Sequence, residues 1–512
     1  MSAVVGLLKG ALAALCVFSC LLGTRPAAAQ SARPFLVRTG SAEDLVQQGR
    51  TLLLQLRLGE AERIFRRVAQ EPGGAPAAFH HLALSSMLKF VMTDSDAYYD
   101  EFFSRSDSLQ DALEQAPEGV WRDYLDAEDQ LNRMVVYAKK GSLFHAALAA
   151  RAAYGRAGTV VKEDPKFYEA YKCMGLLHLG IGLLPSTYRK ILSVLGYGGD
   201  VEQGLRELRV AAAKSAYNRE ESLVLLGLVD GVVYDEPEKA VPVFRKLYEE
   251  NHQSPLFAFF YGYMLLKTRE ADTARQVLQK AVQKDERSGY FFLDYNEFHL
   301  ADALFKKNRF LEAEHYFKRY VEHHHGPALK APAYLELGQA LEMQGRREEA
   351  LTYYGQVEST RGLDADEVAE REAKRLIARV MTPAERQLLL ASNAFGAGDY
   401  AQTRHLLREL WASPALTTDE RAETAYRLGR LYQVQGDATE AIAQFTLAVQ
   451  YSTDPEARWA PWAHFYIGQI YADAGRKELA AQAYRAALEY KGKYDYYQAL
   501  EQSAKAGLKR LE

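Results

Sequence analysis

Three consecutive histidines, His323, His324 and His325, are the densest set of potential metal ligands in the sequence, and His315 precedes them on the same stretch. Structural zinc sites usually take ligands two to four residues apart from two separate segments, and here no cysteine joins the histidines. Neighbouring side chains on a helix point about 100° apart, so the three imidazoles cannot converge on one ion without a distorted loop. Two interpretations stay open: a solvated helix end, where imidazole suits the negative end of the helix dipole, or metal binding.

Other patterns that could support catalysis are incomplete. The Gly-x-Ser-x-Gly pattern of a hydrolase is absent, and the glycine-rich segment 195–200 lacks the Lys-Ser/Thr pair and the preceding strand of a phosphate-binding loop. Cys173 lies on an apolar helix, which is typical of a buried thiol rather than a nucleophile. His80 and His81 are neighbours on a helix, which favours a core or surface role. The sequence therefore predicts a protein that is not an enzyme and has no cofactor.

The charge balance argues against a nucleic-acid partner. The 512 residues carry a formal net charge of −4, which becomes about −6 once a leader containing Lys9 and Arg25 is removed. A dedicated nucleic-acid binder usually presents a large basic surface, and none is expected here. Beyond the leader, no apolar run approaches the roughly 20 residues that span a bilayer, so we expect no transmembrane segment in the mature chain.

Residues 1–29 have the pattern of a signal peptide. A lysine precedes the apolar run ALAALCVFSCLLG, and three small residues, Ala27 to Ala29, end the segment. We expect cleavage after Ala29 and a mature protein that is periplasmic, in a bacterium, or secreted. Processing as a lipoprotein at Cys20 is the less favoured alternative, because Val-Phe-Ser is a poor approach to a lipidated cysteine. Only Cys173 remains in the mature chain, so no intrachain disulfide can form.

The elements that position these residues are helices, because the segment from Ala422 to Leu488 contains the same helical hairpin twice. In each copy a glycine stands in the first helix, a tyrosine follows one turn later, and an aromatic residue lies on the second helix. The equivalent positions are Gly429 and Gly468, Tyr432 and Tyr471, and Phe445 and Tyr484. This is the tetratricopeptide spacing, in which small residues let paired helices pack closely and aromatic rings fill the gaps. One hairpin cannot bury its apolar face alone, so the pattern predicts a stack.

The repeat predicts an all-α protein, an α-solenoid in the form of a right-handed superhelix of about ten helical hairpins. We expect residues 30–40 to be a disordered lead. Residues 41–235 are expected to form an irregular N-terminal array with an insertion at 185–200. Residues 236–512 are expected to form a C-terminal array that ends in a capping helix.

The insertion carries the most specific motif in the chain. Leu184 and the proline after it end one helix, an apolar run follows, and a glycine-rich loop leads to a helix capped by Asp200. Between about Leu183 and Leu208 this order resembles the tetratricopeptide repeat protein 39 and inclusion-body-clearance (outer-membrane TPR) family. The residues that match the family pattern are Leu195, Gly196, Gly199, Asp200, Gly204 and Leu205, with Tyr197 at the family's aromatic position and Gly198 at its serine. The resemblance implies a helical adaptor with no known catalytic residues.

The first helices of successive hairpins face the concave surface in arrays of this type. The repeat register predicts that the inward positions are held by Tyr263, Asp302, Gln339, Tyr426, Arg430, Phe465 and Gln469. An amphipathic aromatic lining favours capture of a peptide or a helix. Some relatives clamp a free C-terminus with a lysine and an asparagine, but Tyr426 and Arg430 stand at those positions, so this mode is not expected.

These features together predict an exported scaffold that mediates protein–protein interaction in the bacterial cell envelope. Its partner is expected to be a protein or a peptide. One alternative is a soluble receptor that holds a small or lipid-like ligand in the apolar bend from Leu184 to Gly199. Another is an enzyme whose site is assembled from distant repeats.

Overall fold

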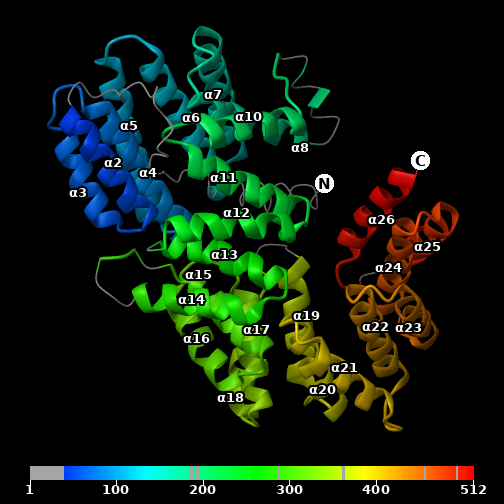
Figure 1. Cartoon of the computed structure of the whole chain (residues 1–512). Helices are drawn as coiled ribbons and strands as arrows, with labels where there is room; N and C mark the ends of the chain where they lie inside the picture. The colour runs from blue at the N-terminus through cyan, green and yellow to red at the C-terminus, as the bar shows by residue number, and fades with distance from the viewer. Residues whose placement is uncertain are drawn as a thin grey trace. The chain divides into compact units, whose positions relative to one another are not determined.

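The computed structural model describes residues 40–184, 189–190, 193, 196–252, 254–285, 289–291, 293–359, 364–454, 457–491 and 494–511. Within these residues it contains 24 α-helices, one π-helical turn and no strand, and consecutive helices pack in pairs, which confirms the predicted all-α solenoid class (Figure 1). The predicted leader and the lead up to residue 39 lie outside the described residues.

The described residues pack as two compact units. The first unit comprises the described parts of Met1–Thr268, Gln276–Glu297 and His323–Gly326, and the second comprises those of Arg269–Arg275, Phe298–Glu322 and Pro327–Glu512. Three helices contribute residues to both units: α14 (Ala271–Asp285), α15 (Tyr295–Lys306) and α16 (Phe310–His323). The sequence-based boundary at residue 235 differs from this division, because α12 (Pro237–Glu250) and α13 (Pro255–Lys267) pack within the first unit.

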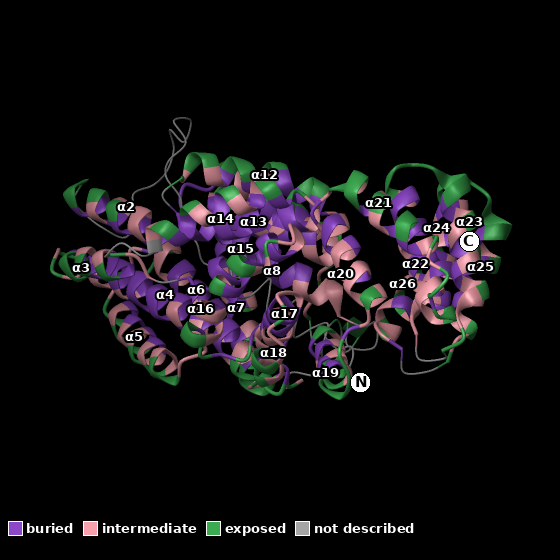
Figure 2. Ribbon diagram, turned by 90° about the horizontal axis from the view of Figure 1, so that it is seen from below, coloured by how far each residue is buried: buried purple, intermediate pink, exposed green. Residues whose placement is uncertain are grey.

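The helices that lie wholly in the first unit follow one another in chain order. They are α2 (Gly40–Leu54), α3 (Leu58–Val68), α4 (Ala75–Thr93), α5 (Asp96–Glu114), α6 (Val120–Lys140), α7 (Leu143–Glu163), α8 (Ala170–Leu183), α10 (Val201–Lys214), α11 (Arg219–Leu228), the π-helical turn η1 (Val229–Val233), α12 (Pro237–Glu250) and α13 (Pro255–Lys267). Helices α4 and α13 are buried on almost every side, so their apolar residues are not confined to one stripe (Figure 2).

The helices that lie wholly in the second unit continue the same pairing. They are α17 (Lys330–Met343), α18 (Arg347–Tyr354), α19 (Asp364–Ala378), α20 (Pro383–Gly396), α21 (Tyr400–Trp411), α22 (Thr418–Val434), α23 (Ala438–Tyr451), α24 (Trp459–Asp473), α25 (Lys477–Glu489) and α26 (Tyr497–Leu511). Helix α19 is an additional helix that lies between two repeats in the chain. Helix α26 packs against α25 at the end of the array, as the predicted capping helix would.

The two clearest repeats are built around the same close contact. A Cβ atom added to Gly429 would lie 2.6 Å from Cδ1 of Phe445, and one added to Gly468 would lie 2.7 Å from Cδ1 of Tyr484. Each glycine is on the first helix of a hairpin and each ring is on the second, so only a residue without a side chain lets the helices approach this closely. The structure therefore places the two glycines at equivalent positions, as the repeat predicts.

The first unit also contains contacts that no repeat period predicts. The Ser254 hydroxyl, at the start of α13, donates to the carbonyl of Leu54 at the end of α2. The Phe291 N–H donates to the carbonyl of Leu56 at 2.6 Å. Residues that are about 200 positions apart in the chain thus satisfy the carbonyls that the end of α2 leaves open.

Candidate functional site

Two of the predicted contact residues lie on α22, the first helix of a hairpin in the second unit. A reciprocal cap starts this helix: the Thr417 hydroxyl accepts from the Glu420 N–H at 3.2 Å, and the Glu420 carboxylate accepts from the Thr417 N–H at 2.9 Å. The cap satisfies two donors at the helix start and fixes where the helix begins. Tyr426 and Arg430 then follow four residues apart, which places them on one helix face.

Five partly exposed side chains are connected by successive contacts between an arginine and a ring or between two rings. We call them the arginine–aromatic row: Arg430, Tyr466, Tyr426, Trp459 and Arg458. The Arg430 guanidinium carbon lies 3.8 Å from the centroid of the Tyr466 ring. The rings of Tyr466 and Tyr426 are 6.2 Å apart, and those of Tyr426 and Trp459 are 5.2 Å apart. The Arg458 guanidinium carbon lies 5.0 Å from the Trp459 ring. These distances are typical of cation–π and aromatic pairs.

The row is supported from the helix behind it. Phe445, a buried residue of α23, stacks on Tyr466 with a centroid distance of 5.6 Å and an interplanar angle of 20°. Trp462, one turn after Trp459 on α24, contacts Tyr466 at 5.7 Å and donates its indole N–H to the Asp495 carbonyl at 3.3 Å. These contacts restrict the rings of the row, so the rings lose little conformational entropy when a ligand stacks on them.

The row carries an excess of positive charge. Arg427, which lies beside Trp459, forms an ion pair with Glu423. Arg430 donates to the Gln433 side chain at 2.9 Å. Among the described residues, neither Arg430 nor Arg458 forms an ion pair with a carboxylate. Arg430 therefore keeps N–H donors for an anionic partner. Arg458 also contacts the Tyr496 ring at 5.5 Å, and within the described part of the chain it has no ion pair that such a partner would have to break.

The local environment keeps these groups in their charged or neutral forms. Burial would lower the pKa of Arg458, but the neighbouring Tyr426, Tyr496 and carboxylates outweigh it and raise the pKa, so the guanidinium stays protonated. Burial, together with the nearby Tyr426, raises the pKa of Tyr466, so its phenol stays neutral. At neutral pH Arg458 is thus a cation and the Tyr466 ring is uncharged.

Phe465 and Gln469 lie on α24 but do not belong to the row. Phe465 holds the repeat position that corresponds to Tyr426, yet it is buried and contacts the Tyr484 ring at 5.7 Å. Gln469 is partly exposed one turn later. Tyr466, the next residue after Phe465, contributes the ring instead, and the adjacent aromatic pair was the signal that sequence reasoning could have used.

The other three predicted contact residues are not brought to α22 and α24. Asp302 on α15 and Gln339 on α17 are each only 9% exposed. Helix α20 packs against the end of α15, where the Asn393 amide donates to the Phe305 carbonyl at 3.0 Å. Tyr263 is on α13 in the first unit. A role for these three residues in partner binding stays a prediction.

Comparison with known families identifies the repeat. Two tetratricopeptide repeat models match residues 298–360 and 463–494, and the second match contains the Gly468 hairpin. The chain is a tetratricopeptide repeat protein. The model for Iml2/Tetratricopeptide repeat protein 39 matches residues 170–326, and the chain resembles that family, as the insertion motif predicts.

Solved structures match this tetratricopeptide repeat protein at low identity. The crystal structure of the APC/C hetero-tetramer Cut9–Hcn1 is 14% identical, covers 92% of this chain and 96% of its own, and gives a TM-score of 0.30. A tetratricopeptide repeat protein from Parabacteroides merdae ATCC 43184 is 13% identical, covers 56% of this chain and 98% of its own, and gives 0.24. YrrB, described as a tetratricopeptide repeat protein with an unusual peptide-binding site, is 16% identical, with 51% and 97% coverage and a TM-score of 0.20. No curated protein matches the sequence.

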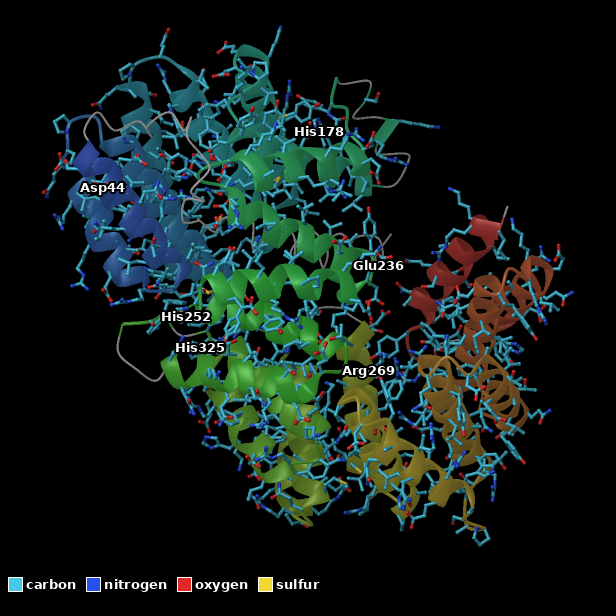
Figure 3. The ribbon with its side chains drawn as sticks, in the orientation of Figure 1. Asp44, His178, Glu236, His252, Arg269 and His325 are labelled. Atoms are coloured by element: carbon cyan, nitrogen blue, oxygen red, sulfur yellow. The ribbon has the colours of Figure 1, made fainter. Side chains whose placement is uncertain are left out.

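The motif that carries the family resemblance has a structural basis where the structure describes it. Asp200 caps α10 by accepting from the Gln203 N–H at 2.7 Å, as predicted. Gly199 has a φ of +143°, and a Cβ there would lie 2.6 Å from Cδ2 of His178, which is labelled in Figure 3. Glycine is therefore required at this position for both backbone and packing. Much of the predicted ligand-holding bend from Leu184 to Gly199 lies outside the described part, namely residues 185–188, 191–192 and 194–195.

The first unit of the repeat protein buries a charged group that sequence reasoning missed. The Lys172 ammonium on α8 donates to Glu128 on α6 at 2.5 Å and also to Glu221 on α11. All three side chains are at most 2% exposed. Burial raises the pKa of Glu221 to about 8, with Lys172 acting in the opposite direction. The sequence signal for this buried charge was a lysine within an otherwise apolar helix. Cys173, the next residue, is buried as expected.

The histidine cluster is divided by the fold. His324 is buried and shares a hydrogen bond with Asp294 at 2.9 Å, whereas His323 and His325 are exposed (His325 is labelled in Figure 3). The interpretation as a solvated helix end is therefore wrong for His324, because the chain folds the end of α16 onto the start of α15. Within the described residues, no group of three or more His, Cys, Asp or Glu side chains is placed to hold a metal ion.

Proposed function

We propose that the chain is an exported scaffold of the bacterial cell envelope that binds a protein partner through the first-helix face of α22 and α24. The tetratricopeptide repeats imply a protein–protein interaction scaffold. The sequence of residues 1–29 supports export, and a mature chain with the single buried thiol of Cys173 suits an oxidising compartment. No described helix is long and apolar enough to cross a membrane.

The arginine–aromatic row is the observation that carries this proposal. Tryptophan, tyrosine and arginine are the residue types that contribute most binding energy at protein interfaces, and here all three are fixed in one partly exposed cluster. Reaction chemistry has no comparable support, because the repeat family is typically non-catalytic and the polar groups of the row are arginines and neutral phenols.

A pull-down from envelope extract tests the partner. The mature chain is immobilised and compared with Trp459→Ala, which removes the ring that contacts both Tyr426 and Arg458, and with Arg485→Ala, a control on the exposed face of α25. We expect wild type and Arg485→Ala to retain a partner through stringent washing, and Trp459→Ala to retain about tenfold less. Equal retention by both variants, or no partner for any of them, would refute the proposal.

Export is tested separately in a bacterial host that produces the full chain. We expect the protein in the periplasmic or secreted fraction, and we expect its N-terminal sequence to begin at Gln30. If the N-terminus is instead a lipid-modified Cys20, the chain is processed as a lipoprotein and is not cleaved after Ala29. An uncleaved chain that stays in the cytoplasm would show that the cell-envelope assignment is wrong.

A further inference from the structure

We propose that the arginine–aromatic row recognises an acidic segment of the partner through side-chain carboxylates rather than through a free C-terminus. This inference rests on the proposed function and names the chemistry of the partner at the same site. Its occupant is a stretch of protein in which carboxylates flank apolar or aromatic residues.

Charge complementarity is the first step of the argument. Two acidic residues lie near the row, and each is already paired: Glu423 with Arg427, and Asp495 with Arg371. Arg430 and Arg458 have no carboxylate partner among the described residues. An acidic segment supplies each of the two arginines with a direct carboxylate partner, and charge-assisted pairs of this kind are stronger than neutral hydrogen bonds.

The orientation of Arg430 is the second step. Its guanidinium carbon lies 3.8 Å from the centroid of the Tyr466 ring, so the cation is held over the face of the ring. The five N–H donors of a guanidinium form a planar fork that matches the two oxygens of a carboxylate, and a cation–π contact does not require all of them. One of these donors is used by Gln433, and the remaining ones are available to a partner.

The separation of the two cations is the third step. Arg430 contacts the Tyr466 ring and Arg458 contacts the Trp459 ring, and Tyr426 joins the two rings with centroid distances of 6.2 and 5.2 Å. An extended peptide advances about 3.3 Å per residue, so the row corresponds to several residues of a partner. The two cations are held on different rings, so two acidic side chains with an apolar residue between them can pair with both arginines and also cover the rings.

Single-stranded nucleic acid is the competing occupant, because bases also stack on aromatic rings and phosphates also pair with arginine. The charge of the whole chain favours the peptide. With a formal net charge of −4 and a pI near 6.4, the protein lacks the basic excess that draws nucleic acid to its binders.

The experiment measures binding of synthetic peptides to the full mature chain. The probes are two acetylated and amidated peptides of about a dozen residues. In the first peptide glutamate alternates with leucine and tyrosine, and in the second peptide glutamine replaces every glutamate. Binding is followed by calorimetry and by tryptophan fluorescence, since Trp459 and Trp462 both lie at the row. We expect the glutamate peptide to bind at least about tenfold more tightly than the glutamine peptide, and to weaken as salt rises from about 50 to about 500 mM.

Matched variants locate the binding. Arg430→Gln and Arg458→Gln are each expected to weaken the glutamate peptide about tenfold, and Arg485→Gln on α25 is expected to change it less than about twofold. Hydrogen exchange of α22 and α24 in each variant shows that the helices stay folded. Because both probes are amidated, binding by them also excludes a requirement for a free C-terminus.

Three results would overturn the inference. They are equal binding of the two amidated peptides, binding only of a version with a free C-terminus, and tighter binding of a single-stranded RNA oligomer than of the glutamate peptide. If the envelope partner is retained by the immobilised protein while any of these results is obtained, the scaffold function stands and only the acidic chemistry is wrong.

Discussion

Replacing Gly468 by alanine tests the packing on which the whole repeat depends. A Cβ at this position would lie 2.7 Å from the Tyr484 ring, whereas ordinary van der Waals contact begins at 3.4 Å. The ring, or the helix that carries it, must therefore move by about 0.7 Å. Overpacking of this kind costs about 1–3 kcal/mol, while the better helix propensity of alanine returns about 1 kcal/mol. We expect a net loss of stability of about 0–2 kcal/mol in the α24–α25 hairpin.

Gly155 on α7 provides the matched control. It is an exposed helical glycine with no atom within 4 Å of an added Cβ, so alanine there gains helix propensity without overpacking. We expect Gly155→Ala to stabilise α7 by about 1 kcal/mol. The two substitutions are chemically identical, so the difference between their effects, about 1–3 kcal/mol, reports the close approach of the paired helices.

Native-state hydrogen exchange is the appropriate assay, because it gives an opening free energy for each hairpin of an array that does not unfold in one step. A second change, Tyr484→Leu, removes the obstructing ring, so Gly468→Ala should cost less in that background. If Gly468→Ala stabilises its hairpin as much as Gly155→Ala stabilises α7, the glycine is not a packing requirement and the reasoning fails.

Three further predictions follow from single contacts. Lys172→Met leaves two buried glutamates without their cation and should destabilise the first unit by about 3–5 kcal/mol, whereas replacing all three charged residues by apolar ones should be close to neutral in urea denaturation. Thr417→Ala removes the cap of α22 and should cost about 1 kcal/mol, measured by hydrogen exchange of that helix. Burial would raise the pKa of Glu62, but hydrogen bonds from Arg105 and Lys89 outweigh it and lower the pKa from 4.5 to about 2. The stability that this carboxylate contributes is present above pH 4.5 and is lost as the pH falls through 2, so an acid titration of Glu62→Gln should show a smaller loss over that range.

The sequence predicts the local part of the fold because that part is periodic. The spacing of Gly429 and Gly468 identifies the hairpins, and the rings that the same register assigns to the second helices, Phe445 and Tyr484, are the ones that contact them. The contact between Leu54 and Ser254 could not be predicted in this way. It joins residues with no shared period, and its energy depends on the final packing rather than on any pattern within one hairpin.

The site was predictable to the same extent. The register placed Tyr426 and Arg430 on a first-helix face, and the structure brings them together through Tyr466. Arg458 and Trp459 were missed because they precede the repeat register, at the start of α24. Asp302 is mostly buried and forms an ion pair with Lys306. Helix α20 packs against the end of the same helix, a contact that a uniform repeat does not contain.

The first helices of the two units differ in the internal hydrogen bonds and ion pairs that a partner would have to break. In the first unit, Glu169 at the start of α8 accepts hydrogen bonds from the Ser215 hydroxyl and the Ala216 N–H, so the start of this helix already binds the chain's own loop before α11. A partner there would first break buried hydrogen bonds, and each orphaned polar group costs about 1–3 kcal/mol. On α22 and α24, Arg430 and Arg458 have no carboxylate partner to lose among the described residues. An acidic partner therefore gains charge-assisted bonds at this face without that cost, which is why the binding site is assigned to it.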